Sequence, residues 1–450
     1  MRKSDPLSME NIGVQRERKL VIKAGGSILS HGASFESTAN SIMSHLDTYD
    51  RIFVVVSAPN GITDMITRLL DSPDESESVM ILNRIRENLL LTGCSRDQAD
   101  STLENIITYS SLFSRTGKSA YRDLALIQGE LFSSMKLESV LRQNGSNSAG
   151  IMYPSRFLSF RRNSKNELEL DQLKTESSFK SLLKLMDSYR ILIVPGFYGK
   201  NGKGRIITIG RGGSDLTASI MSILTHADKL EFWKDVNGIY SMDPRHYSGS
   251  VRIPEISMQN AALLDLLGSR ILQERSITSL LNHNDLPSIE VKATASKDSG
   301  TILGNKNAFD FLISILDNAS IRIYLKKFDR INPLKLQNIS SSTHISVGHN
   351  LFMEISRGSF KRMNQTTSTV LSTKFHISLI SIFIGDYLGR YSYSFFKRLK
   401  LSIGKSFPES DIYYSQELNI IFIPGSFEIK HGILNCIKET AQEVQESWTK

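Results

Sequence analysis

Continuous apolar runs, rather than alternating apolar and polar positions, mark the first 300 residues of the chain. "KLVIKAGG", "RIFVVVSAPNG" and "ILIVPGFYG" each contain such a run and then turn at glycine or proline. Strands that are apolar on both faces are typical of a parallel sheet covered by helices on each side. Residues from about 78 to 141 have no such run and read as helices, as does "LTASIMSILTHA". This alternation predicts an α/β fold with an open, mainly parallel sheet.

The pattern changes after "SGTILGN" (Ser299–Asn305), where glycine-rich loops end and short strands and amphipathic helices follow. "SIRIYL", "ISLISIFIG" and "LNIIFIPG" read as strands, and "HGILNCIKETAQEVQ" as a closing helix. We therefore expect a flexible N-terminus over residues 1–18, an α/β domain over 19–304 and an α+β region over 305–450.

Composition narrows the class of protein and its location. An apolar fraction of 40% and a charged fraction of 22% are those of an ordinary globular protein. The net charge of +8 is best explained by a solvated basic surface, which would also attract an anionic substrate. Without a Lys/Arg stripe interleaved with aromatics, we expect no nucleic-acid partner. Cys94 and Cys436 offer no disulfide framework or metal spacing. We see no signal peptide and no bilayer-length apolar run, so we expect a cytoplasmic protein without a membrane partner.

Three loops after buried strands combine glycine with cations or hydroxyls: "KAGGS" (Lys23–Ser27), "SAPNGITD" (Ser57–Asp64) and "IITIGRGGSD" (Ile206–Asp215). In the third loop Arg211 offers a planar fork to a carboxylate or phosphate, and Ser214 suits a helix N-cap. A tight strand-to-helix turn would explain that loop alone equally well. In a parallel sheet, however, all three gather at the carboxyl edge, where ligands bind. No Walker A loop occurs, and no G-x-G-x-x-G follows a strand, which disfavours a dinucleotide enzyme.

The ordered set "KAGGS", "VVVSAPNGITD", "QGELFSS", "GRGGSD", "DVNGIYSMDPR" and "SGTIL" resembles aspartate kinase, of the amino-acid kinase family, from Lys19 to about Leu303. The resemblance implies transfer of the ATP γ-phosphoryl group to the side-chain carboxylate of L-aspartate, with Mg²⁺ accompanying ATP. The product, 4-phospho-L-aspartate, begins the route to lysine, diaminopimelate, threonine and methionine. A carboxylate nucleophile is already ionised, so the reaction needs positioning and positive charge rather than a general base.

The resemblance also assigns roles to residues. Lys23 would lie against the transferring phosphoryl group and Asp215 would orient Lys23. Glu130 would hold the α-ammonium of aspartate and Arg211 its α-carboxylate. The implied substrate-binding set is Ser57, Thr63, Glu130, Arg211, Gly212, Gly213 and Ser214. The implied ATP-binding set is Lys23, Gly25, Gly26, Ser27, Lys234, Asp235, Tyr240, Arg245 and Arg270. No protein side chain is assigned to the metal.

Several residues depart from the family pattern, among them Ser27, which replaces a threonine but keeps the hydroxyl, and "RILQE" (Arg270–Glu274), which replaces Lys-Val-Leu-His-Pro. Ala24 replaces an aromatic, Lys234 replaces a threonine, and Arg270 stands where the family has lysine. These departures concern nucleotide placement and keep open a catalytically weak or inactive ligand sensor. A second alternative is a kinase for glutamate, acetylglutamate or a nucleoside monophosphate. Glu130 argues against the last two substrates, because an acid there is useful only to a substrate with a free ammonium.

The region over 305–450 is where the family carries two ACT modules, which commonly bind a feedback amino acid at a dimer interface. The resemblance therefore implies a homodimer or higher homo-oligomer and an amino-acid effector such as lysine. A purely structural dimerisation region is the alternative, since no effector-site sequence is evident in this chain.

Overall fold

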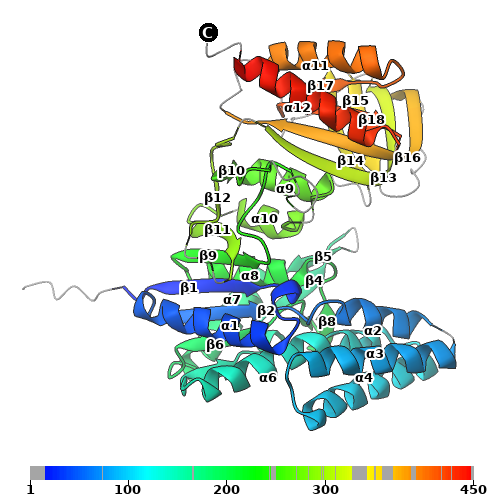
Figure 1. The fold of residues 1–450 in the computed structure, drawn as a ribbon. Coiled ribbons are helices and arrows are strands. Elements are labelled where there is room, and N and C mark those ends of the chain that lie inside the picture. The colour runs from blue at the N-terminus through cyan, green and yellow to red at the C-terminus, as the bar shows by residue number, and fades with distance from the viewer. Residues whose placement is uncertain are drawn as a thin grey trace, which may run out of the picture.

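The computed structural model describes residues 16–446 except 73, 165–166, 243, 245–249, 270, 282, 295, 297, 310, 327–341, 349–350, 357–367, 387–391, 417 and 427. Two sheets dominate the described part. The first belongs to the α/β half of the chain, and the second lies at the opposite end of the molecule with the C-terminal helices (Figure 1).

The first sheet has eight strands in the order β10-β12-β11-β9-β1-β2-β6-β3, and every pairing is parallel except that of β11 with β12. The apolar runs form its central strands, and β2 is buried at every position. The α/β prediction is therefore confirmed. The strands are β1 (Lys19–Ala24), β2 (Arg51–Val56), β3 (Ala149–Ile151), β6 (Ile191–Pro195), β9 (Lys229–Lys234), β10 (Glu255–Ser257), β11 (Ser288–Ala293) and β12 (Thr301–Gly304).

Helices cover both faces of this sheet because its strands are apolar on both sides. One face packs against α1 (Gly32–Ser44) and α6 (Gln128–Gln143). The other packs against α7 (Gln172–Leu185), α8 (Gly213–Leu224), α9 (Met258–Leu266) and α10 (Glu274–Leu281).

Two smaller units flank the first sheet. Four helices pack around a separate apolar cluster and extend to one side (Figure 1). They are α2 (Ile62–Asp71), α3 (Glu75–Leu91), α4 (Arg96–Thr116) and α5 (Ser119–Leu126). A four-stranded sheet in the order β5-β4-β7-β8 consists of β4 (Ser159–Arg162), β5 (Leu168–Leu170), β7 (Tyr198–Asn201) and β8 (Ile206–Thr208).

The second sheet is antiparallel, in the order β14-β15-β13-β16-β18-β17. All three strands and the closing helix expected in this region are present. Because those strands share one sheet, the division into two ACT-like modules stays a prediction. The elements are β13 (Phe311–Lys326), β14 (Ser342–Gly348), β15 (Leu351–Ser356), β16 (Ser368–Ile384), α11 (Ser392–Ser406), β17 (Tyr413–Ser415), β18 (Ile420–Gly425) and α12 (Lys430–Glu446).

The second sheet is joined to the first half of the chain through its inner face. Helices α11 and α12 cover its outer face, while inner residues such as Leu316 and Phe422 share one apolar cluster with Leu264 of α9. The Ser314 hydroxyl donates to the Leu267 carbonyl oxygen at 3.0 Å. The two sheets therefore share a core.

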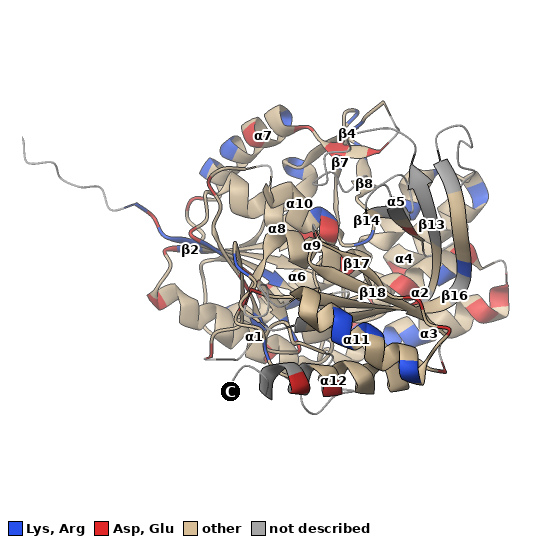
Figure 2. Ribbon diagram, turned by 90° about the horizontal axis from the view of Figure 1, so that it is seen from above, with Lys and Arg blue, Asp and Glu red and all other residues tan. Residues whose placement is uncertain are grey.

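Charged side chains are spread over many elements. Lysine and arginine occur on α7, α11 and several other helices rather than along one stripe (Figure 2). None of the helices among the described residues combines the length and apolarity that crossing a bilayer requires.

Candidate active site

The first two glycine-containing loops follow β1 and β2, which are adjacent parallel strands of the first sheet, as predicted. The third loop was expected to follow a strand of the same sheet, but it follows β8, which pairs antiparallel with β7 in the four-stranded sheet. It reaches the carboxyl edge of the first sheet because it leads into α8, whose Asp215 contacts Lys23. The Ser57 N–H, after β2, donates to the Ala24 carbonyl oxygen at the end of β1, at 3.2 Å. The Gly196 N–H, after β6, donates to Val56 at 2.9 Å. A Cβ on Gly196 would lie 2.7 Å from the Cβ of Ser214, so this loop touches the start of α8. Adjacent parallel strands thus bring the segments after β1, β2 and β6 together, and the contact of Gly196 with Ser214 brings the start of α8 to the same place.

A buried ion pair joins the first and third loops. Lys23 is the fifth residue of β1, and Asp215 lies in the first turn of α8. The Lys23 Nζ and Asp215 Oδ1 atoms are 2.8 Å apart, and each side chain is only 8% exposed. Burial acts to raise the pKa of Asp215, but the ammonium groups of Lys23 and Lys234 outweigh it and hold the pKa below its ordinary value. Asp215 therefore remains an anion that fixes the Lys23 ammonium.

Glycine is required in the first loop because the loops approach so closely. A Cβ on Gly26 would lie 2.6 Å from the carbonyl oxygen of Ala58 in the second loop. A Cβ on Gly25 would lie 3.4 Å from the Lys23 Nζ. Gly26 then begins a short 3₁₀ turn that includes Ser27. Backbone N–H groups in glycine turns of this kind bind phosphate oxygens, and this turn begins three residues after Lys23.

The third loop enters α8 through left-handed glycines, and one expectation about it is wrong. Gly212, with φ 71°, is the N-cap, whereas Ser214 was expected there. Ser214 instead lies in the first turn and is buried. The left-handed turn places Gly213 so close to Phe197 that a Cβ would lie 2.9 Å from the Phe197 Cα. Arg211 is exposed at the tip of this loop, four residues before Asp215.

Glu130 is a buried acid with an unsatisfied oxygen. It lies in the first turn of α6, is 3% exposed, and its Oε2 has no hydrogen-bond partner among the described residues. Burial raises the pKa of Glu130 to about 8, opposed by the backbone N–H groups of Ala58 and Glu130 itself and by Lys23. Ala58 lies between Ser57 and Thr63, both partly buried in or after the second loop. This carboxyl group is suited to a cation that arrives with a substrate.

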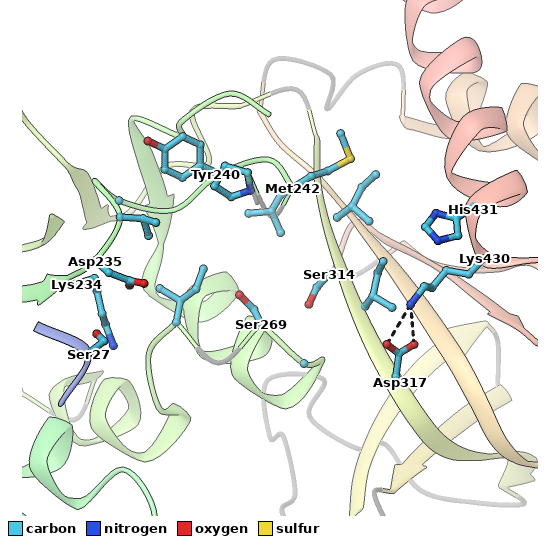
Figure 3. Close-up of a pocket in the computed structure, with 18 residues that line it drawn as sticks. Ser27, Lys234, Asp235, Tyr240, Met242, Ser269, Ser314, Asp317, Lys430 and His431 are labelled. Carbon is cyan, nitrogen blue, oxygen red and sulfur yellow. Dashed lines mark hydrogen bonds and ion pairs between the residues drawn. The ribbon is translucent and has the colours of Figure 1, made fainter. Parts of the chain in front are cut away.

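A cavity of about 720 Å³ opens beside the first loop (Figure 3). Ser27, Lys234, Asp235 and Tyr240, four members of the implied ATP-binding set, line one end of it. Arg245 and Arg270 lie outside the described residues. The other end is lined by residues that sequence reasoning did not find: Ser269, Ser314, Asp317, Lys430 and His431.

Those missed residues do not belong to any recognisable motif. Most of them line the cavity only because the second sheet and α12 pack beside it. The Lys430 Nζ, at the start of α12, is 3.1 Å from Asp317 Oδ2 on β13 (Figure 3). Phe197, in "PGFYG", was also missed, although its φ of 77° is unusual for a non-glycine residue beside a ligand loop. No signal in a single sequence distinguishes these positions.

The first glycine loop carries groups of the kind that bind phosphate. The described part of the chain contains no cluster of three or more histidine, cysteine or acidic side chains that could hold a metal ion. The groups nearest the glycine loops are the Lys23 ammonium and backbone N–H donors. They bind phosphate oxygens.

Comparison with known proteins identifies the protein family to which the chain belongs. The model of the amino acid kinase family matches residues 18–288, so the chain belongs to the amino acid kinase family. Among curated proteins, lysine-sensitive aspartokinase 3 of Escherichia coli is 28% identical over 294 residues, covering 64% of each chain. The aspartokinase of Chlamydia pneumoniae is 29% identical over 259 residues, covering 56% of each chain. The similarity to aspartate kinases inferred from the motifs is confirmed, and the matches span less than two thirds of the relatives' length.

Solved structures show the same fold over nearly the whole chain. E. coli aspartokinase III in complex with aspartate and ADP has a TM-score of 0.73, at 20% identity, and the match covers 94% of this chain and 99% of that one. The aspartate kinase of Clostridium acetobutylicum has a TM-score of 0.62, at 19% identity, covering 94% and 99%. The second sheet and its helices therefore belong to an arrangement found in aspartate kinases.

Proposed function

We propose that the chain is an aspartate kinase that transfers the γ-phosphoryl group of ATP to the side-chain carboxylate of L-aspartate. The observation that carries this proposal is the buried Lys23–Asp215 pair at 2.8 Å beside the unsatisfied carboxyl group of Glu130. Lys23 would bind the phosphate and Glu130 would bind an ammonium group, and both lie at the same edge of the sheet. This arrangement fits a phosphoryl acceptor that is an amino acid.

Each end of aspartate has a counterpart in this site. Glu130 would pair with the α-ammonium, which would offset the burial that raises the Glu130 pKa. Arg211 and the backbone of Gly212–Ser214 would hold the α-carboxylate, at a helix N-terminus that favours anions. Ser57 and Thr63 would line the same pocket. The side-chain carboxylate is then free to approach the phosphoryl group.

Catalysis in this proposal is positioning plus charge. Lys23, oriented by Asp215, would contact the transferring phosphoryl group, and the backbone N–H groups of Gly25, Gly26 and Ser27 would cradle it. Asp235 and Tyr240 would contact the nucleotide farther along the cavity. Mg²⁺ would enter with the triphosphate and neutralise part of its charge, while the protein contributes the ammonium and N–H donors.

The regulatory and assembly predictions stay proposals. Lysine-sensitive aspartokinase 3 and a structure of E. coli aspartokinase III in complex with lysine and aspartate support an amino-acid effector such as lysine. A homodimer or higher homo-oligomer in the cytoplasm fits the same relationship. The second candidate function is a catalytically weak sensor, favoured by Ala24 and Lys234. Retention of the Lys23–Asp215 pair argues against it.

The test is an acyl-phosphate assay on the full chain. The protein is incubated with ATP, Mg²⁺ and L-aspartate, and hydroxylamine traps the product as a hydroxamate. We expect hydroxamate with L-aspartate and much less with L-glutamate or N-acetyl-L-glutamate. Nucleotide and lysine binding without hydroxamate from any acid would support the sensor and overturn the kinase.

A further inference from the structure

Lys234 places a second ammonium at the active site, where the family pattern has threonine. It is the last residue of β9, which pairs with β1 on one side and β11 on the other. Leu230 and Phe232 lie on the same face of the strand as Lys234, and both are buried in the core. Lys234 therefore occupies the carboxyl edge, one position beyond Trp233, which pairs with Ala24 of the first loop.

Its side chain lies at the phosphate end of the cavity. Lys234 lies beside Ser27 of the glycine loop, and both line the cavity (Figure 3). The charged groups that face it are Asp215 of α8, Lys23 of β1, the neighbouring Asp235, and Asp265 of α9. These are the groups around the proposed phosphoryl position, whereas Ser314 and Lys430 mark the opposite end (Figure 3).

Among the residues that the structure describes, none forms a hydrogen bond or ion pair with the ammonium of Lys234. Asp215 is bound at 2.8 Å by Lys23. Burial lowers the pKa of Lys234 to about 8, against the attraction of Asp215 and with the help of Lys23. Asp215 thus attracts both lysines, but it is bound directly by Lys23 alone. An unpaired, partly buried ammonium costs stability unless a ligand offsets it.

We propose that Lys234 is a second catalytic lysine, whose ammonium contacts the transferring phosphoryl group opposite Lys23. This inference rests on the proposed kinase function. In the transfer, an aspartate carboxylate oxygen forms a bond to the γ-phosphorus as the bond from that phosphorus to the β–γ bridging oxygen breaks. The electron pair leaves with ADP, and no proton moves. Lys234 would neutralise phosphoryl oxygens through the transition state while Asp215 keeps Lys23 in place.

A structural role for Lys234 predicts the opposite stability effect. A lysine that held β9 in place would need a partner, and its removal would destabilise the protein. A lysine that waits for phosphate destabilises the free protein, so its removal leaves the unfolding temperature unchanged or raises it. The two roles are therefore separable without measuring activity.

The first experiment compares Lys234→Thr and Lys234→Met with Lys174→Thr, which removes the same charge from an exposed position on α7. We expect kcat to fall at least tenfold in both Lys234 variants, with a smaller change in KM for ATP. The unfolding temperature without nucleotide should not fall, and its rise on adding ATP should shrink. Lys174→Thr should match the wild type. Unchanged kcat, or a lower unfolding temperature with an unchanged rise on ATP, would overturn the inference.

A second experiment reads contact directly on the wild-type chain. Pyridoxal 5′-phosphate forms an imine with accessible lysines of lowered pKa, and borohydride reduction fixes it for peptide mass spectrometry. We expect ATP to protect Lys234 from this labelling. Labelling that ATP does not reduce would overturn the contact. If the wild type forms no acyl phosphate, the proposed function fails, whereas ATP protection of Lys234 would still support its contact with phosphate.

Discussion

At the scale of single residues, the site consists of charges that are buried before any substrate arrives. Asp215 is compensated by Lys23 at 2.8 Å, so this pair is already arranged. Glu130 is not compensated in the same way, and burial raises its pKa to about 8. The buried Glu130 carboxylate therefore lowers the stability of the free protein, and a bound cation would offset this cost. In the proposed function, that imbalance makes Glu130 the residue on which recognition of the substrate ammonium depends.

Glu130→Gln should lower kcat/KM for aspartate about 30-fold or more, because losing one member of a buried charge pair costs about 2–5 kcal/mol. ATP affinity should change less, since Glu130 is not among the residues that line the cavity with Ser27, Asp235 and Tyr240. Steady-state kinetics with each substrate varied provide the measurement. Glu138→Gln, in the same helix and paired with Arg142, is the matched control. Equal losses in both variants would contradict the role of Glu130.

The raised pKa of Glu130 also predicts a pH dependence of stability. The folded state favours the protonated carboxyl, so its contribution is present below pH 4.5 and is lost as pH rises toward about 8. Glu130→Gln removes this titration. The variant should therefore gain unfolding temperature relative to the wild type between pH 5 and pH 8. A constant difference across that range would argue against a buried, substrate-free carboxyl.

Much of this residue-level chemistry could be predicted from the sequence, because Lys23, Glu130 and Asp215 lie in ordered motifs. The helix cap could not: Ser214 is a good capping residue, yet the left-handed turn required Gly212 at the cap. That Lys234 has no hydrogen-bond or ion-pair partner among the described residues could not be predicted either. It depends on Lys23 already occupying Asp215, which is a matter of tertiary geometry.

At the scale of elements, the site depends on how closely three loops approach one another. The first and second loops touch at Gly26, where a Cβ would lie 2.6 Å from a backbone carbonyl oxygen. A backbone atom at that distance cannot rotate away as a side chain can. The strands β1 and β2 are parallel neighbours in register, so neither loop can shift without moving its strand.

Gly26→Ala should therefore lower the free energy of unfolding by about 1–3 kcal/mol, as overpacking does, and should reduce turnover by displacing the phosphate cradle. Denaturant unfolding and the hydroxamate assay give the two measurements. Gly202→Ala, in the turn between β7 and β8, is the control because its Cβ would meet nothing within 4 Å. A Gly26→Ala protein with the stability of Gly202→Ala would show that the loops are not in contact.

Elements were predicted well where burial dictates composition. The continuous apolar runs became the central strands of a parallel sheet, since both faces are covered. The strand pairing of the second sheet could not be predicted as well from the sequence. Its fragments were recognised as strands and a helix, but single runs do not reveal that β13 and β16 form long antiparallel neighbours in one sheet.

At the scale of the whole molecule, the two halves are continuous in their interior. One apolar cluster includes Val55 and Leu264 from the first half and Leu316, Phe383 and Phe422 from the second sheet. The Ile313 N–H donates to the Ser241 carbonyl oxygen at 2.8 Å across the same junction. Separating the halves would expose apolar surface on both.

The full chain should consequently unfold in one cooperative calorimetric transition, with equal calorimetric and van't Hoff enthalpies. A fragment that ends at residue 304 should expose part of the shared cluster and aggregate at concentrations where the full chain does not. Two well-resolved transitions, or a fragment as stable as the full chain, would show that the junction contributes little.

The cavity beside the glycine loops has walls from both sheets, and this has a consequence for control of the enzyme. Any tilt of α12 and β13 against β9 would change the room available to the nucleotide, although no residue of the catalytic loops had moved. Thermodynamic reciprocity requires the converse, so a nucleotide that favours one tilt would also hold the C-terminal sheet in it. A change in how the C-terminal sheet packs could therefore alter the volume of the cavity, because β13 and the start of α12 form part of its wall.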